Sequence, residues 1–77
     1  MTEFTVRKGK RYRASIRLGL LEQIADNRLI ASKLEQAGFS DVTVSGSGAS
    51  RTAEGLWPNE DASASLPAQV HSVEEIA

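Results

Sequence analysis

A strictly alternating run near the N-terminus, RYRASIRLG, constrains the fold of this chain more than any other feature. Even positions carry Tyr12, Ala14, Ile16 and Leu18, and odd positions carry Arg11, Arg13, Ser15 and Arg17. A period of two is typical of a strand with one buried face and one solvated face. We therefore predict a strand here, with its apolar side under another element and its arginines on the open side of a sheet.

The next segment, LLEQIADNRLIASKLEQAGF, changes to a helical period. Its apolar stripe consists of Leu20, Ile24, Ile30, Ala31, Leu34 and Ala37. Asp26 or Asn27 caps a helix that runs through Gln36, because both side chains accept hydrogen bonds from the first turn. Gly38 follows the last turn, where the left-handed conformation favours glycine. The stripe leaves two alternatives for the start of the helix, one near Leu20 and one near Asn27.

Two further strands are predicted after the helix, joined by the stretch SGSGAS. Val42 and Val44 point the same way in the first, and the second ends at Pro58 because proline has no amide to donate. A strand, a helix and a strand suit a right-handed crossover between parallel strands, and the short Gly/Ser link suits an antiparallel hairpin. The predicted fold class is α+β: a small sheet of three to four strands in β-α-β-β order, one main helix on one face, and a short C-terminal helix or strand.

The 77 residues correspond to a single small domain with less regular ends. Residues 1–9 form either an extra strand, carried by Phe4 and Val6, or a frayed arm. Residues 59–65 are expected to be a polar loop. Residues 66–77 form a short element. It is either a helix with Pro67 in its first turn, or a helical turn followed by an edge strand.

The residue types needed for most catalytic chemistry are scarce. The chain has no cysteine and one histidine, His71. SGSGAS lacks both the lysine of a P-loop and the GxGxxG spacing of a dinucleotide-binding turn, so it reads as a hairpin tip. We therefore predict that the protein is not an enzyme and has no cofactor and no metal site.

Charge is distributed unevenly along the chain. Six of the nine basic residues lie within the first 17 positions, whereas no lysine or arginine follows Arg51. A basic front and an acidic back allow head-to-tail association or binding of an anionic partner. No apolar run is long enough to span a bilayer and no signal peptide is evident, so we expect a cytoplasmic protein or part of a larger assembly.

The predicted binding surface is the open face of the sheet. Its residues are Arg11, Arg13, Ser15, Arg17 and Thr43, with Arg51 at the rim beside the turn. Arginines along a strand provide bidentate donors for phosphate, carboxylate or a nucleic-acid backbone. Solvated arginines, or a cross-strand pair with Glu54, are the alternative. Tyr12 and Trp57 are assigned to the core.

The order RYRASIRLG, NRLIASKLEQAGFSDVTV and SRTAEGLWP resembles the SPOR domain, a bacterial peptidoglycan-binding module of the ferredoxin-like class. The resemblance covers residues 11–58. It rests on the asparagine at the start of the predicted helix, on the dipeptide GF that follows the helix, and on the stretch EGLWP that ends the last of these strands. It implies a glycan ligand on the open face, near Arg13, Ser15, Arg17 and Thr43. The family repeats a helix and a strand after this point, whereas the remaining tail here is short.

Three functions from different classes remain open at this point. The first is a non-enzymatic interaction module that binds another protein or a glycan through the open face or an edge of the sheet. The second is a structural subunit of a homo-oligomer or a phage-like assembly, and the third is a nucleic-acid-binding module. The expected partner is another protein or a second copy of the chain; a glycan or a nucleic acid is the alternative.

Overall fold

The structure is a computed structural model that describes residues 3–65 and 67–76. Its elements are β1 (Glu3–Val6), β2 (Lys10–Arg17), the 3-10 turn η1 (Glu22–Ile24), α1 (Asn27–Ala37), β3 (Ser40–Ser47), β4 (Ser50–Trp57), β5 (Ala62–Ser65) and β6 (Val70–Ile76). Strands hold 53% of the described residues and helices 19%, so this part of the chain is mostly β. The predicted α+β fold in β-α-β-β order is therefore wrong.

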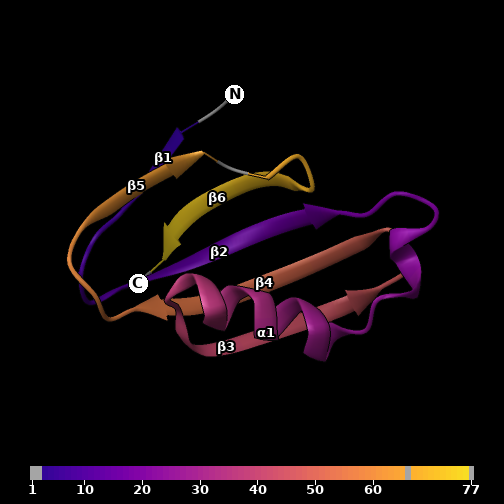
Figure 1. Cartoon of the computed structure of the whole chain (residues 1–77), viewed down its shortest axis with the longest axis horizontal. Coiled ribbons are helices and arrows are strands. Elements are labelled where there is room, and N and C mark those ends of the chain that lie inside the picture. Colours follow the sequence, from indigo (N-terminus) through magenta and orange to yellow (C-terminus); the bar gives the residue numbers. More distant parts are fainter. Residues whose placement is uncertain (1–2, 66, 77) are drawn as a thin grey trace.

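Six strands among the described residues form two antiparallel sheets (Figure 1). The larger sheet has the order β3-β4-β2-β6, and the smaller one pairs β1 with β5. Because β2 and β3 are both antiparallel to β4, they run in the same direction, yet β4 lies between them and they do not pair. The described residues thus hold six strands, more than the three to four that were predicted.

The helix forms where local capping favours it. The Asp26 side chain accepts a hydrogen bond from the amide of Leu29 and opens α1 at Asn27. Gly38 ends the helix at φ 120°, and its amide bonds back to the carbonyl groups of the last turn. Capping by Asp26 and the later of the two predicted helix starts are confirmed. The helix crosses one face of the sheet over β3 and β4 (Figure 1).

The core lies at the end of the sheet where β1 and β5 approach β2 and β4. Its buried members are Val6, Tyr12 and Trp57, and Phe4, Phe39 and Val73 pack against them. Phe4 meets Tyr12 edge to face at a ring-centroid distance of 5.4 Å, and Phe39 meets Trp57 at 4.9 Å. The prediction that Tyr12 and Trp57 belong to the core is confirmed.

Described residues near both ends of the chain form strands. Residues 1–9 were predicted to be either an extra strand or a frayed arm, and Glu3–Val6 form the extra strand β1. β1 pairs with β5, with Glu3 opposite Ser65, and does not form a hairpin with β2. Residues 59–65 were expected to be a polar loop, but they contain β5. Ala62–Ser65 form a strand because β1 supplies a partner for its backbone hydrogen bonds. Of the two alternatives for the C-terminal element, the strand is correct, since β6 pairs with β2. Leu66 and Ala77, part of the same prediction, lie outside the described residues.

Candidate functional site

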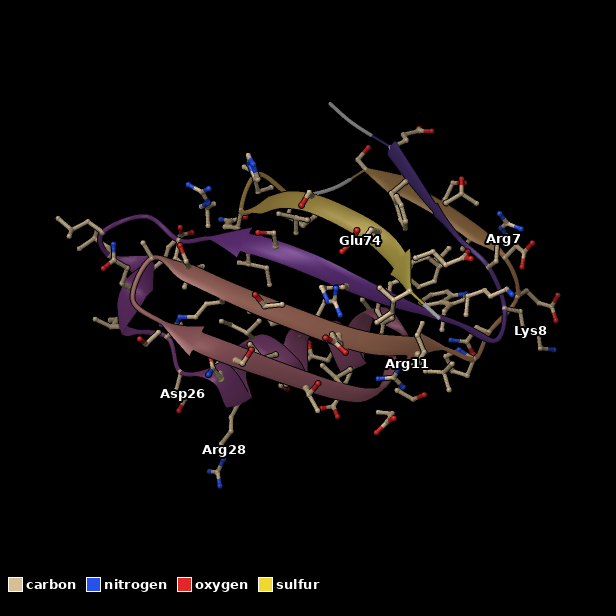
Figure 2. The ribbon with its side chains drawn as sticks, turned by 180° about the vertical axis from the view of Figure 1, so that it is seen from behind. Arg7, Lys8, Arg11, Asp26, Arg28 and Glu74 are labelled. Carbon is tan, nitrogen blue, oxygen red and sulfur yellow. The ribbon has the colours of Figure 1, made fainter. Side chains whose placement is uncertain are left out.

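The strand registers bring five of the six predicted binding residues to one face of the sheet. Figure 2 shows Arg11 on this side, with α1 behind the sheet. Arg13 lies opposite Glu54, Ser15 lies opposite Thr52, and Thr43 also lies opposite Glu54. Residues directly opposite each other across an antiparallel pair share a face. The surface formed by Arg11, Arg13, Ser15, Arg17 and Thr43 is called the open face below.

Carboxylates accompany the first two arginines of the open face. Arg13 sits between Glu54 on β4 and Glu74 on β6, at N–O distances of 3.1 and 3.4 Å. Hydrogen bonding to Glu54, and then the negative charge of Glu54, raise the pKa of Arg13, and Glu74 adds to the effect. Arg11 pairs with Asp41 at 2.9 Å. The predicted cross-strand pair with Glu54 is therefore present, and much of the basic charge is balanced within the chain.

Arg51 lies on the other side of the sheet. It is only 6% exposed, and it shares the helix-covered face because it lies opposite Ile16. Its guanidinium group donates to the Gly48 carbonyl, to Asn27 Oδ1 at 2.8 Å and to the Gln23 carbonyl. The side chain thus ties the β3–β4 turn to the start of α1, whereas Arg51 was predicted at the rim of the open face.

The alternation of residues along β4 does indicate the face on which Arg51 lies. In RTAEGLW, position 51 has the same parity as positions 53, 55 and 57, and Trp57 is a core residue. An arginine on the same parity as a buried tryptophan is expected to point inward. Its burial is tolerated because neighbouring carbonyl oxygens accept hydrogen bonds from its N–H groups.

Replacing Arg51 with methionine is expected to lower the free energy of unfolding by about 2 kcal/mol. Arg51→Met keeps an apolar stem but leaves Asn27 Oδ1 and two carbonyl oxygens without their donor. Urea unfolding would measure the change. Arg17→Met removes an exposed arginine of the open face and should change stability by less than about 0.5 kcal/mol. Equal losses for the two variants would show that the Arg51 network does not hold the turn.

A pocket with a volume of about 380 Å³ opens on the helix-covered face. Its lining is almost entirely apolar: Phe4, Val6, Tyr12, Ala14, Leu34, Ala37, Phe39, Val42, Ala53, Gly55, Trp57, Ala62, Pro67, Val70 and Val73, with Lys33, Ser63 and Ser65. The pocket exists because α1, the single α-helix among the described residues, covers only β3 and β4 (Figure 1). The β1–β5 pair bounds the other side, so the middle of this face stays uncovered. We refer to it as the apolar pocket.

A second apolar surface lies at the junction of β2 and α1. Leu20, Leu21 and Ile24 are 83%, 84% and 91% exposed. The Glu22 carboxylate holds this junction through the Gly19 amide at 2.7 Å and the Gln69 amide group at 2.6 Å. The first of these hydrogen bonds, and then the second, lower the pKa of Glu22. Residues 20–24 are called the apolar segment below.

Residues 3–65 and 67–76 hold no group of three or more potential metal-ligating side chains. Among these residues there is also no helix long and apolar enough to cross a membrane.

Comparison with protein-family models, with curated proteins and with solved structures finds no match for the chain. The resemblance to the SPOR domain therefore stays a prediction. Fold and surface together describe a small, mostly β domain with a charge-paired face on one side and an apolar pocket on the other.

Proposed function

We propose that this protein is a non-enzymatic interaction module that binds an apolar segment of a protein partner in the apolar pocket. The observation that carries the proposal is the uncovered apolar area between α1 and the β1–β5 pair. Contiguous apolar surface on a folded domain marks an interaction site, because water contact with it is unfavourable. The pocket has a few polar groups at its margin, as binding pockets in proteins generally do.

Lys33 indicates the chemistry of the partner. It is the one charged residue among the described residues that line the pocket. A partner segment with two or three bulky aliphatic side chains and one carboxylate would fill the volume and pair with this ammonium group. The burial of apolar area would provide most of the affinity, and the charge would set the orientation.

A negatively charged apolar dye, 8-anilinonaphthalene-1-sulfonate, tests whether the pocket accepts such a ligand. We expect saturable binding of one dye per chain at low protein concentration, with a change in the emission of Trp57, the single tryptophan, which lines the pocket. Ala37→Glu adds a charge to the pocket wall and should weaken binding at least tenfold. Gln36→Glu adds the same charge one residue away, outside the lining, and should leave binding unchanged.

Two results would contradict the proposed function. One is the absence of saturable dye binding by the wild-type protein. The other is equal dye affinity for Ala37→Glu and Gln36→Glu. Cooperative thermal unfolding by circular dichroism would confirm that both variants are folded, because loosely packed states also bind this dye.

The open face is a second candidate surface, favoured by one observation. Arg17 is exposed and makes no ion pair with any residue that the structure describes, unlike Arg11 and Arg13. Together with Ser15 it offers donors to an anionic or glycan partner. Binding of peptidoglycan or of nucleic acid at low salt, lost in Arg17→Ala, would support this surface. Retention of neither ligand by the wild-type protein would remove it.

A further inference from the structure

The apolar segment is held in an exposed position by hydrogen bonds on both sides. The Glu22 carboxylate accepts hydrogen bonds from the Gly19 amide and the Gln69 side chain, and the Gln23 carbonyl accepts one from Arg51. The aliphatic side chains of Leu20, Leu21 and Ile24 are therefore presented to solvent from an ordered turn. A surface that is ordered before binding loses less conformational entropy when it docks.

These anchors keep the apolar segment out of the pocket of its own chain. η1 lies beyond the end of β2 and before the start of α1 (Figure 1). The pocket is lined from the middle and end of α1, by Lys33, Leu34 and Ala37. To enter it, residues 20–24 would have to break their contacts with Gln69 and Arg51. An occupant of this kind must therefore come from another molecule.

The apolar segment has the chemistry that the apolar pocket requires. It contributes three bulky aliphatic side chains and one carboxylate, that of Glu22. The pocket contributes an apolar lining and one ammonium group, that of Lys33. Both hydrogen bonds of Glu22 leave its negative charge in place, so it can attract Lys33 of a neighbour while still holding η1.

Building on the function proposed above, we propose that the partner in the apolar pocket is the apolar segment of a second copy of this chain. The contact joins two different surfaces, so one copy's Leu20, Leu21 and Ile24 enter the pocket of the next. If two copies each insert their apolar segment into the pocket of the other, they form a closed dimer. If each copy inserts its segment into the next copy only, the contact builds an open chain of subunits.

Sedimentation equilibrium at increasing protein concentration tests this proposal. The wild-type mass is expected to rise above that of the monomer. The double variant Leu21→Lys, Ile24→Lys replaces two of the three aliphatic side chains of the apolar segment, and Ala37→Glu obstructs the pocket. Each is expected to weaken self-association at least tenfold, and both change exposed positions, so the fold should persist. Leu29→Lys alters an exposed leucine outside the segment and is expected to associate like the wild type.

Mixing the two defective proteins provides the decisive result. The segment variant keeps an intact pocket and the pocket variant keeps an intact segment, so the mixture should regain association that neither shows alone. A monomeric wild type at all concentrations, a mixture that stays monomeric, or variants that associate as the wild type does would overturn the proposal. If the dye still binds the wild-type pocket, the failure concerns only the second copy; if it does not, the proposed function fails as well.

Discussion

Ala53→Asp is expected to unfold the domain or leave it marginally stable at neutral pH. Ala53 is 2% exposed, the lowest value among the described core residues, and lies on the inner strand β4 between Ala14 and Val44. An unpaired carboxylate buried there costs about 3–5 kcal/mol. A chain of this length has a total stability of roughly 4–12 kcal/mol. One substitution therefore removes a large part of the stability.

Urea unfolding monitored by circular dichroism measures this effect. Thr52→Asp is the matched control, because Thr52 precedes Ala53 on the same strand, points to the open face and is exposed. It should shift stability by less than about 0.5 kcal/mol. Burial raises the pKa of a carboxyl group, so the deficit of Ala53→Asp relative to wild type should shrink as the pH falls toward about 4. Similar unfolding midpoints for the two variants would refute the assignment of the two sheet faces.

Gly46→Ala is expected to disrupt the β3–β4 hairpin and to destabilise the domain by about 2–3 kcal/mol. Gly46 has φ 97°, which is unfavourable for alanine, and an added Cβ would lie 2.6 Å from the Ser50 backbone oxygen. Backbone cannot swing aside as a flexible side chain would, so the two strands must separate locally. The Gly46 carbonyl also accepts from Asn27, and a shift there would reach the Arg51 network.

Gly48→Ala separates the strain of positive φ from the effect of the collision. Gly48 lies in the same hairpin at φ 66°, and an added Cβ meets nothing within 4 Å. Alanine there should cost about 1 kcal/mol, the penalty for the left-handed conformation alone. Comparison of the two urea midpoints tests this difference. If Gly48→Ala were as damaging as Gly46→Ala, close packing of β3 against β4 at Gly46 would not be the cause.

The candidate surfaces were only partly predictable from the sequence. Arg11, Arg13, Ser15, Arg17 and Thr43 were correctly grouped on one face, because strand alternation is a local property. The ion pair of Arg13 with Glu74 was not foreseen, since it depends on β6 pairing with β2. The apolar pocket was not predicted either. It depends on how α1 and the β1–β5 pair are placed, since together they leave the middle of the helix-covered face of the sheet uncovered.

Local signals in the sequence determined the faces of β2, the Asp26 cap, the Gly38 exit of α1 and the end of β4 before Pro58. Each depends on neighbours within a few residues, where periodicity and backbone preference decide the outcome. Only the tertiary structure decided the pairing of β1 with β5 and of β6 with β2, partners about 60 residues apart. A short stretch of alanine and serine such as β5 has a weak intrinsic preference for the strand conformation. Hydrogen bonding to a distant part of the chain therefore selected the strand.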